Sequence, residues 1–401
     1  MSGRARYAAI LRAPHVASLL LASMLARLPY GLYALAAILY LSEARDSYVV
    51  AGLVDGAFGL GAAAGVPLQS RLIDRLGQRR VLLPAAVVDV TATGALIALT
   101  ETGAPAAALM ACGLAGGIAV PNVGGALRAL WPALLRHRVD LLPAAFALDS
   151  VALELLFTAG PLLAAMIVVV ASPVTALILC AGCSLLGTAA FVTRPPSRAW
   201  RPEPGAGSHG ALGALRSSGV RTVAFAAVPV GFCFGAVEIT LPAFAEEHGA
   251  AELAGVLLAT WSVASAIGGL AYGARTWPGS LGSIYLWLSL LLPLGYLPAL
   301  LASSIPAMAL LILPAGLLIA PQAAACNELI GRLAPAGAVT EAYAWPVTAT
   351  LLGFAPGTAL GGLLVEEVGW HACFAAAALT AAIGAAVVYT YRRTLVSPQP
   401  V

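Results

Sequence analysis

The sequence predicts an all-α integral membrane protein that crosses a bilayer twelve times. The 401-residue chain is 60% hydrophobic and only 10% charged, whereas soluble domains carry roughly 25% charged residues. Twelve apolar segments are each long enough to cross about 30 Å of hydrocarbon as a helix. Arginines gather at alternate ends of these segments, and an even number of spans explains that pattern.

The predicted spans begin and end where apolar runs meet charged residues, glycine or proline. In order along the chain they cover residues 14–41, 48–69, 81–100, 104–126, 143–170, 174–193, 221–245, 252–273, 281–302, 306–326, 341–365 and 370–391. The first run is too long for the apolar core of a cleavable signal peptide, so we expect it to remain as a span.

The longest polar stretch, residues 194–220, separates the sixth span from the seventh. It is rich in Pro, Gly, Ser and Arg and is expected to be a cytoplasmic linker. It divides the chain into an expected N-terminal six-helix bundle, residues 1–193, and a C-terminal six-helix bundle, residues 221–401. The halves share weak similarities, such as Pro-Asn at 121–122 and Pro-Gln at 321–322. Such parallel repeats predict a substrate path between the halves near the midplane.

The distribution of arginine predicts the orientation. With the N-terminus in the cytoplasm, nineteen of the 21 arginines lie on the cytoplasmic side, Arg45 lies outside and Arg27 lies within the membrane. The outer loops carry acidic residues instead. The positive-inside rule therefore predicts that both termini are cytoplasmic. The absence of lysine indicates a GC-rich genome, and we expect a multi-pass protein of a bacterial cytoplasmic membrane.

The composition argues against several other classes. The arginines are scattered over loops, so no nucleic-acid partner is expected. All six cysteines fall inside apolar spans and are expected to pack there. Cys180 and Cys183 lie on one helix without a nearby histidine, and the histidines lie at span ends or in loops, so no metal site is expected. No G-x-x-x-x-G-K-[ST] loop occurs, so nucleotide-driven transport and a cofactor are not expected.

A short charged loop joins the second and third spans. Its residues include Asp74, Arg75, Gly77, Arg79 and Arg80, at the spacing D-R-x-G-x-R-R. This pattern resembles the signature loop between the second and third helices of the major facilitator superfamily of transporters. The resemblance implies the major facilitator fold. It also implies that these five residues form a cytoplasmic gate, which latches the halves together when that side is closed.

The chemistry of this loop suits a latch that can open. Gly77 permits a tight turn. Asp74 can accept hydrogen bonds from an arginine at the turn and from a helix N-terminus, where the macrodipole favours an anion. Positive-inside anchoring explains Arg79 and Arg80 but not Asp74. In the second half Trp277 stands where the matching aspartate would be, so a latch is expected only in the first half.

The fifth span contains a Gly-Pro pair in segment 159–165, whose sequence is A-G-P-L-L-A-A. It is similar to a relaxed form of the antiporter motif G-P-x-x-G-G, with two alanines in place of glycines. This similarity implies the twelve-helix drug/proton antiporter-like group. An ordinary Gly-Pro kink explains the segment equally well. The intramembrane arginine that such antiporters carry in the fourth span is absent from residues 104–127.

Ionisable side chains inside the spans are the candidates for proton coupling. A charge at the centre of a membrane helix costs roughly 2.5–3.5 kcal/mol on insertion scales. Arg27 lies about 20 Å of helix rise into the first span, near the midplane. We expect Glu154 to carry the proton with Arg27 as its partner, because burial disfavours a charged carboxylate and a nearby arginine favours it. Asp149 is expected to join a charge network at the helix end. A static Arg27–Glu154 ion pair is the alternative.

The expected substrate site combines charged, amide and aromatic side chains near the midplane. Its predicted residues are Arg27, Tyr30, Tyr33, Asn122, Glu238, Trp261, Gln322 and Trp345. Packing is the alternative for the aromatic residues, interhelical hydrogen bonding is the alternative for the two amides, and an outer-gate contact is the alternative for Glu238. Asp55 and Asp89 are expected to be structural.

These observations predict a secondary active transporter that moves a small molecule by alternating access. Proton-coupled efflux of an amphipathic drug or secondary metabolite is expected, with the substrate, protons and membrane lipid as partners of a monomer. An importer or facilitator of a small metabolite is the first alternative. A non-transporting polytopic membrane protein is the alternative from another class. An enzyme is not expected, because the sequence has neither a G-x-S-x-G motif nor clustered histidines and acids.

Overall fold

The structure is a computed structural model that describes residues 2–202 and 213–396. Within these ranges the chain forms α-helices and short 3-10 helices, and it forms no strand. Twelve helical segments are long and apolar enough to cross a membrane, which confirms the predicted all-helical class. In a bilayer only such segments satisfy every backbone hydrogen bond internally, so apolar length is a strong predictor of this fold.

The first half of the chain contributes six of these segments. Its helices are α1 (Gly3–Arg12), α2 (Val16–Arg27), α3 (Pro29–Arg45), α4 (Tyr48–Leu76), α5 (Gln78–Glu101), α6 (Ala106–Ala119), α7 (Val123–Leu134), η1 (Val139–Leu141), α8 (Leu142–Val170), α9 (Pro173–Thr193) and α10 (Pro195–Ala199). The first span consists of α2 and α3, and the fourth consists of α6 and α7. Pro29 and Pro121 lie at these two breaks, because proline supplies no backbone N–H to continue a helix.

The second half contributes the other six. Its helices are η2 (Gly213–Arg216), α11 (Ser218–Glu247), η3 (Ala251–Leu253), α12 (Ala254–Gly273), α13 (Leu281–Tyr296), η4 (Leu297–Leu301), α14 (Ile305–Leu311), α15 (Leu313–Leu333), α16 (Val339–Glu367), α17 (Trp370–Thr390) and η5 (Arg392–Leu395). The tenth span is interrupted at Ile312, whereas Pro321 lies inside the continuous α15. The break at Pro121 therefore has no counterpart at the matching proline of the second half.

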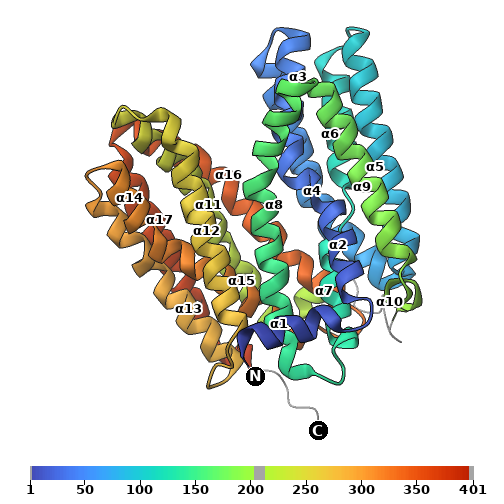
Figure 1. Ribbon diagram of the computed structural model, residues 1–401, viewed down its shortest axis with the longest axis vertical. Coiled ribbons are helices and arrows are strands. Elements are labelled where there is room, and N and C mark those ends of the chain that lie inside the picture. The colour runs from blue at the N-terminus through green and yellow to red at the C-terminus, as the bar shows by residue number, and fades with distance from the viewer. Residues whose placement is uncertain (1, 203–212, 397–401) are drawn as a thin grey trace.

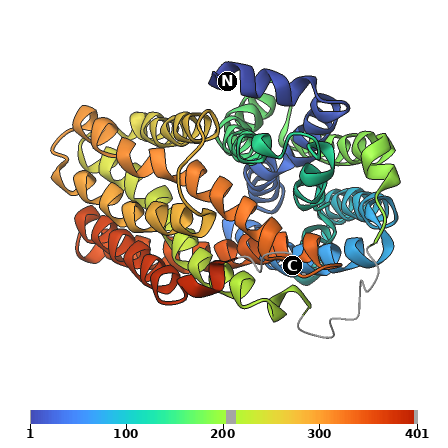
Figure 2. The same ribbon diagram turned by 90° about the horizontal axis from the view of Figure 1, so that it is seen from below.

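The helices of the two halves form two groups that lie side by side (Figure 1). At one end, which carries α1, α7 and α10 and is called the α1 side below, the groups come together. At the other end they spread apart. Seen along the molecule, the blue-to-green helices and the yellow-to-red helices occupy separate regions (Figure 2). Helices α4 and α8 of the first group pack against α16, α12 and α15 of the second.

The buried cores follow the same division. On the α1 side a single apolar cluster takes residues from both halves, including Ile10, Phe146, Leu329 and Tyr343. On the opposite side the apolar residues of each half form a cluster of their own. The two halves therefore share a core at one end of the molecule only.

Glycines allow the backbones of α11 and α16 to approach closely. A Cβ at Gly231 would overlap the carbonyl oxygen of Thr350, and a Cβ at Gly353 would overlap the carbonyl oxygen of Val228. Small residues are the usual means of such approach between membrane helices, where dispersion contacts and not the exclusion of water hold helices together. These glycines therefore allow the close packing of α11 against α16 within the second half.

Several predicted boundaries differ from the structure. The second span continues to Leu76 instead of residue 69, so Asp74 and Arg75 of the expected loop lie in α4, and the tenth span continues to Leu333 instead of residue 326. The fourth span does not end at residue 126 but continues through α7 to Leu134, so Arg128 lies inside it. The expected linker 194–220 contains α10 and η2, and α11 begins inside it at Ser218. The middle of that linker, residues 203–212, lies outside the described residues.

Candidate functional site

The charged segment at the end of α4 reaches across to the second half of the chain. Asp74 is buried, and its carboxylate oxygens accept hydrogen bonds from the backbone N–H groups of Thr340, at 3.0 Å, and Glu341, at 2.8 Å. These N–H groups belong to the first turn of α16, whose capping residue Ala338 offers no side-chain acceptor. Asp74 thus supplies from the first half the cap that α16 lacks, at the end where a helix dipole favours an anion.

An ion pair reinforces this contact. Arg71 lies one turn before Asp74, and its Nη2 is 2.6 Å from Oε1 of Glu341. Glu341 is buried, and the backbone of Gly213 lies against its carboxylate, so that a side chain at Gly213 would overlap it. The sequence prediction that a helix N-terminus binds Asp74 agrees with this geometry. The sequence also predicts an arginine partner for Asp74, whereas the ion pair of the nearby Arg71 is with Glu341.

The other residues of the loop have different surroundings. Gly77 has φ +93°, which favours glycine, and it ends α4 so that α5 can begin at once. Arg75, Arg79 and Arg80 are exposed. Gln78 is buried and donates a hydrogen bond to the carbonyl of Ala126 at 3.0 Å, which ties the turn to α7. The exposed arginines are therefore available to solvent or to lipid headgroups.

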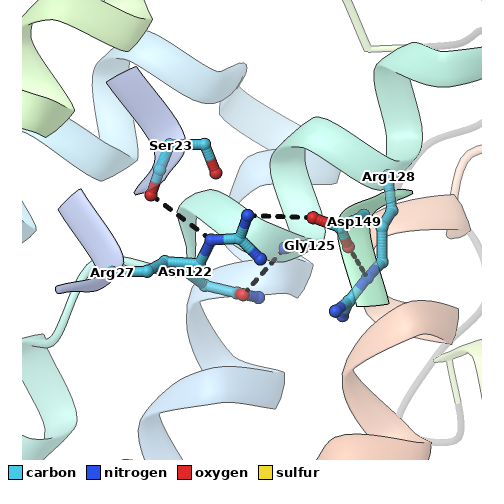
Figure 3. A network of polar contacts seen from close by, with 6 residues as sticks. All are labelled: Ser23, Arg27, Asn122, Gly125, Arg128 and Asp149. Carbon is cyan, nitrogen blue, oxygen red and sulfur yellow. Dashed lines mark hydrogen bonds and ion pairs between the residues drawn. The ribbon is translucent and has the colours of Figure 1, made fainter. Parts of the chain in front are cut away.

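A buried charge cluster lies in the first half (Figure 3). Nη2 of Arg27 is 2.9 Å from Oδ1 of Asp149, and Nε of Arg128 is 2.8 Å from Oδ2 of the same carboxylate. The Asp149 side chain is fully buried and that of Arg27 is 1% exposed. Two cations thus share one anion in a region that excludes water, where charges are retained only if they are paired.

This cluster corrects the expected pairing of the first span. Arg27 pairs with Asp149 and not with Glu154. Asp149 and Glu154 are five residues apart on α8, which rotates them by roughly 140° about the helix axis. Only Asp149 faces the inside of the first bundle, where α2 and α7 supply the two arginines. The expectation that Arg128 is a cytoplasmic loop residue is also wrong, because the structure buries it in α7.

The break in the fourth span is held by polar side chains. Asn122 caps α7 by accepting from the N–H of Gly125 at 3.1 Å, and its amide donates to the hydroxyl of Ser70 at 2.6 Å. Gln69 donates to the carbonyls of Ile118 and Val120, at 2.7 and 2.8 Å. The hydroxyl of Tyr30 lies 3.4 Å from the carbonyl of Pro121, to which it donates. Irregular backbone at membrane depth is tolerated where such partners satisfy its polar groups.

Glu154 lies on the side of α8 that packs against α12 of the second half. Its side chain is half-buried and faces Ser265, a buried residue of α12. No arginine within residues 2–202 and 213–396 forms an ion pair with it. Glu154 is therefore an acid at the boundary between the halves without a cationic partner there.

The remaining candidates do not form one site. Gln322 donates to the hydroxyl of Ser289 at 3.2 Å within the second half. Tyr33 stacks on Phe58 with ring centroids 4.1 Å apart within the first half. These contacts match the packing and interhelical alternatives for both residues.

Two candidates of the second half, Trp261 and Glu238, lie on neighbouring helices that pack together. Trp261 of α12 meets Phe234 of α11 edge to face, with centroids 5.6 Å apart, and Glu238 lies one turn further along α11 and is exposed. Trp345 of α16 is half-buried, and its Nε1 has no hydrogen-bond partner among the described residues. Asp89 accepts from Ser184 at 2.6 Å inside the first bundle, as a structural role would require.

Several residues of these networks were not anticipated from the sequence. They are Arg71, Glu341, Arg128, Gln69 and Ser70. For Arg71 a signal exists, because it lies three residues before Asp74 and so shares its helix face. For Arg128 the signal is ambiguous, since a single arginine near a span end fits both a loop and a buried ion pair.

Comparisons with known proteins agree with the architecture. A model of the Major Facilitator Superfamily matches residues 19–280. No curated protein matches the sequence.

Solved structures resemble the whole chain. The crystal structure of the human organic anion transporter MFSD10 (TETRAN) is 20% identical, with a TM-score of 0.69 over 93% of this chain and 98% of that chain. A bacterial homologue of the iron transporter ferroportin, in an outward-facing state, is 14% identical, with a TM-score of 0.74 over 94% and 98%. The proton:xylose symporter XylE bound to 6-bromo-6-deoxy-D-glucose is 14% identical, with a TM-score of 0.70 over 93% and 95%. At these identities the similarity is one of fold.

Proposed function

The chain belongs to the major facilitator superfamily, and from that premise we propose that it exports a small amphipathic compound in exchange for protons. The observation that carries the proposal is the asymmetry of the two ends of the molecule. The halves share an apolar core and the Asp74–α16 contact on the α1 side, whereas their cores are separate on the opposite side. This is the arrangement expected of one of the two states of alternating access.

The arginine distribution supports placing the α1 side in the cytoplasm. The structure then corresponds to a state closed toward the cytoplasm. To reach the other state, α16 must leave Asp74 and Arg71. Both contacts are of a strength that permits this, since a helix cap contributes about 0.5–2 kcal/mol and a partly exposed ion pair up to about 1 kcal/mol.

Glu154 is the acid that we propose carries the proton. Asp149 holds two arginines and so is suited to remain charged. Glu154 has no cationic partner among the described residues and lies where α8 meets the second half. An unpaired carboxylate at a boundary that opens alternately to the two sides can bind a proton on one side and release it on the other. The Arg27–Asp149–Arg128 cluster then has the supporting role of fixing α2, α7 and α8 to one another.

An amphipathic substrate fits one set of side chains in each half. Glu238 is exposed beside the aromatic pair Phe234 and Trp261, and this combination can receive a cationic or polar group next to an apolar one. Tyr30 and Asn122 adjoin the break in the fourth span on the first half. We propose that the substrate path runs between these two sets of residues.

Transport by the purified chain in inside-out proteoliposomes tests this function. An acidic lumen should drive uptake of one or more members of a panel of amphipathic dyes and drugs, and a protonophore should abolish that uptake. Movement that ignores the pH gradient would instead identify a facilitator or importer. If no compound moves although the reconstituted protein is folded, the result would favour a non-transporting membrane protein.

A further inference from the structure

A cavity of about 470 Å³ opens on the α1 side, at the boundary between the two halves. The first half contributes Arg6 of α1 and Asp140 of η1 to its lining. The second half contributes Ala274, Arg275 and Thr276, which follow α12. Any ligand that fills this cavity therefore contacts both halves at once.

Helix α1 forms one wall and is attached to both halves. The hydroxyl of Tyr7 donates to the carbonyl of Leu270 in α12 at 2.8 Å, and a Cβ at Gly3 would overlap the methyl group of Ala274. Toward the first half, Nη2 of Arg6 donates to the carbonyl of Asp140 at 2.6 Å. Burial raises the pKa of Tyr7 to about 12, so its hydroxyl remains a donor at neutral pH. The wall is therefore built by specific contacts across the boundary.

The charges around the cavity do not balance. Arg6 is only 5% exposed, and its Nε has no hydrogen-bond partner among the described residues. The carboxylate of Asp140 is already bound by Arg138, at 3.0 and 3.1 Å. Within residues 2–202 and 213–396 no carboxylate forms an ion pair with Arg6 or Arg275. A buried guanidinium without an ion pair is costly, and the exposed Arg275 places a second cation at the same cavity.

We propose that this cavity binds a phosphate-bearing anion, which joins Arg6 to Arg275 and holds the α1 side closed. Guanidinium groups bind phosphate oxygens through paired N–H donors, and the Thr276 hydroxyl is a further donor at the cavity. The cavity has the size of a small-molecule pocket and exceeds what a single phosphate ion needs. The source of the phosphate is the headgroup of an anionic phospholipid or a soluble phosphate compound, and both present the same oxygens to the arginines.

Binding to the full chain in detergent separates these sources. Phosphatidylglycerol is titrated and bound lipid counted by native mass spectrometry, with phosphatidylcholine as the reference, and inorganic phosphate is titrated by calorimetry. We expect saturable binding of one phosphatidylglycerol, and Arg275→Gln should lower its affinity by about tenfold or more, which corresponds to losing one charged hydrogen-bonded contact of about 1.4 kcal/mol. Saturable phosphate binding with the same dependence on Arg275 would identify a soluble ligand instead.

Two variants serve as controls. Arg275 is exposed, so Arg275→Gln should fold normally, and it is the decisive variant even if the buried Arg6→Gln does not fold. Arg4→Gln removes an exposed arginine from the same helix as Arg6 and should leave binding unchanged. Equal losses in Arg4→Gln and Arg275→Gln would reveal diffuse charge attraction and overturn the proposal. Absence of saturable binding of either probe to the wild-type chain would also overturn it.

A second readout tests the effect on closure. The N–H groups of Thr340 and Glu341 donate hydrogen bonds to Asp74 when the halves are together. Hydrogen exchange at these two groups therefore reports separation of the halves. Addition of the probe that binds, phosphatidylglycerol or inorganic phosphate, should slow this exchange in the wild-type chain but not in Arg275→Gln. An anion that binds through Arg275 without slowing exchange would refute the role in closure.

Discussion

The carboxylate of Asp74 accepts a hydrogen bond from the backbone N–H of Thr340 at 3.0 Å, although 266 residues separate them in the sequence. The same carboxylate accepts from Glu341, so one side chain of the first half occupies the capping position of a helix in the second. A helix cap made within one element only stabilises that element. A cap made between halves adds its free energy to one conformational state, and it is lost when the halves part.

Replacing Asp74 with alanine should therefore favour opening of the α1 side. The first turn of α16 loses two acceptors, and loss of a cap costs about 0.5–2 kcal/mol. Exchange at Thr340 and Glu341 should become several-fold to about thirtyfold faster, which is the ratio that this free energy implies. Turnover should fall while substrate affinity changes little. Arg75→Ala is the matched control, because Arg75 is in the same motif but exposed; equal effects of the two variants would argue against a specific cap.

Replacing Asp149 with asparagine should destabilise the folded chain strongly. The substitution removes the only anion of the buried cluster and leaves Arg27 and Arg128 unpaired, for which a cost of about 3–5 kcal/mol is typical. A lower Tm and a smaller monodisperse fraction after purification would be the measured result. Asp140→Asn provides the comparison, because Asp140 also pairs with an arginine but is exposed, and it should change the Tm little. A Tm close to that of the wild type for Asp149→Asn would mean that the cluster tolerates water.

The twelve spans were predictable from the sequence because each apolar helix satisfies its own backbone hydrogen bonds in lipid. Their number and order need no knowledge of which helices meet. The end of the fourth span was misplaced for a specific reason. Arg128 looks like a residue that ends a span, and only the position of Asp149 on a different helix makes its burial possible.

Which acid of α8 pairs with Arg27 could be determined only from the structure. Asp149 and Glu154 both lie in the fifth span, and from its depth in that span the sequence favours Glu154 as the partner of Arg27. Which of them faces Arg27 depends on the rotation of α8 against α2, and no sequence spacing fixes that angle. For Asp74, three residues before the turn at Gly77, the sequence predicts an arginine and a helix N-terminus as partners, and the helix N-terminus is present. Its identity as the end of α16 came only from the structure.

Replacing Gly353 with alanine should weaken the packing of the second half. A methyl group there would overlap the Val228 carbonyl, so α11 and α16 must separate, and such overpacking costs about 1–3 kcal/mol. Gly362→Ala on the same helix is the control, because no atom lies within 4 Å of a Cβ there. That variant should be neutral or slightly more stable, since alanine favours a helix over glycine. Thermal unfolding of both would measure the difference, and equal Tm values would contradict the close packing.

Replacing Glu154 with glutamine tests the proposed route of the proton most directly. The amide keeps the size and polarity of the side chain but cannot bind and release a proton, and Glu154 has no arginine partner in the described residues whose charge would then be left unpaired. The variant should therefore fold with a Tm near that of the wild type and still exchange substrate across the membrane. It should lose the uptake that an acidic lumen drives in inside-out vesicles. Glu246→Gln, which neutralises an exposed acid at the end of α11 in the same way, should keep that response. Uptake by Glu154→Gln at the wild-type rate would exclude Glu154 as the carrier.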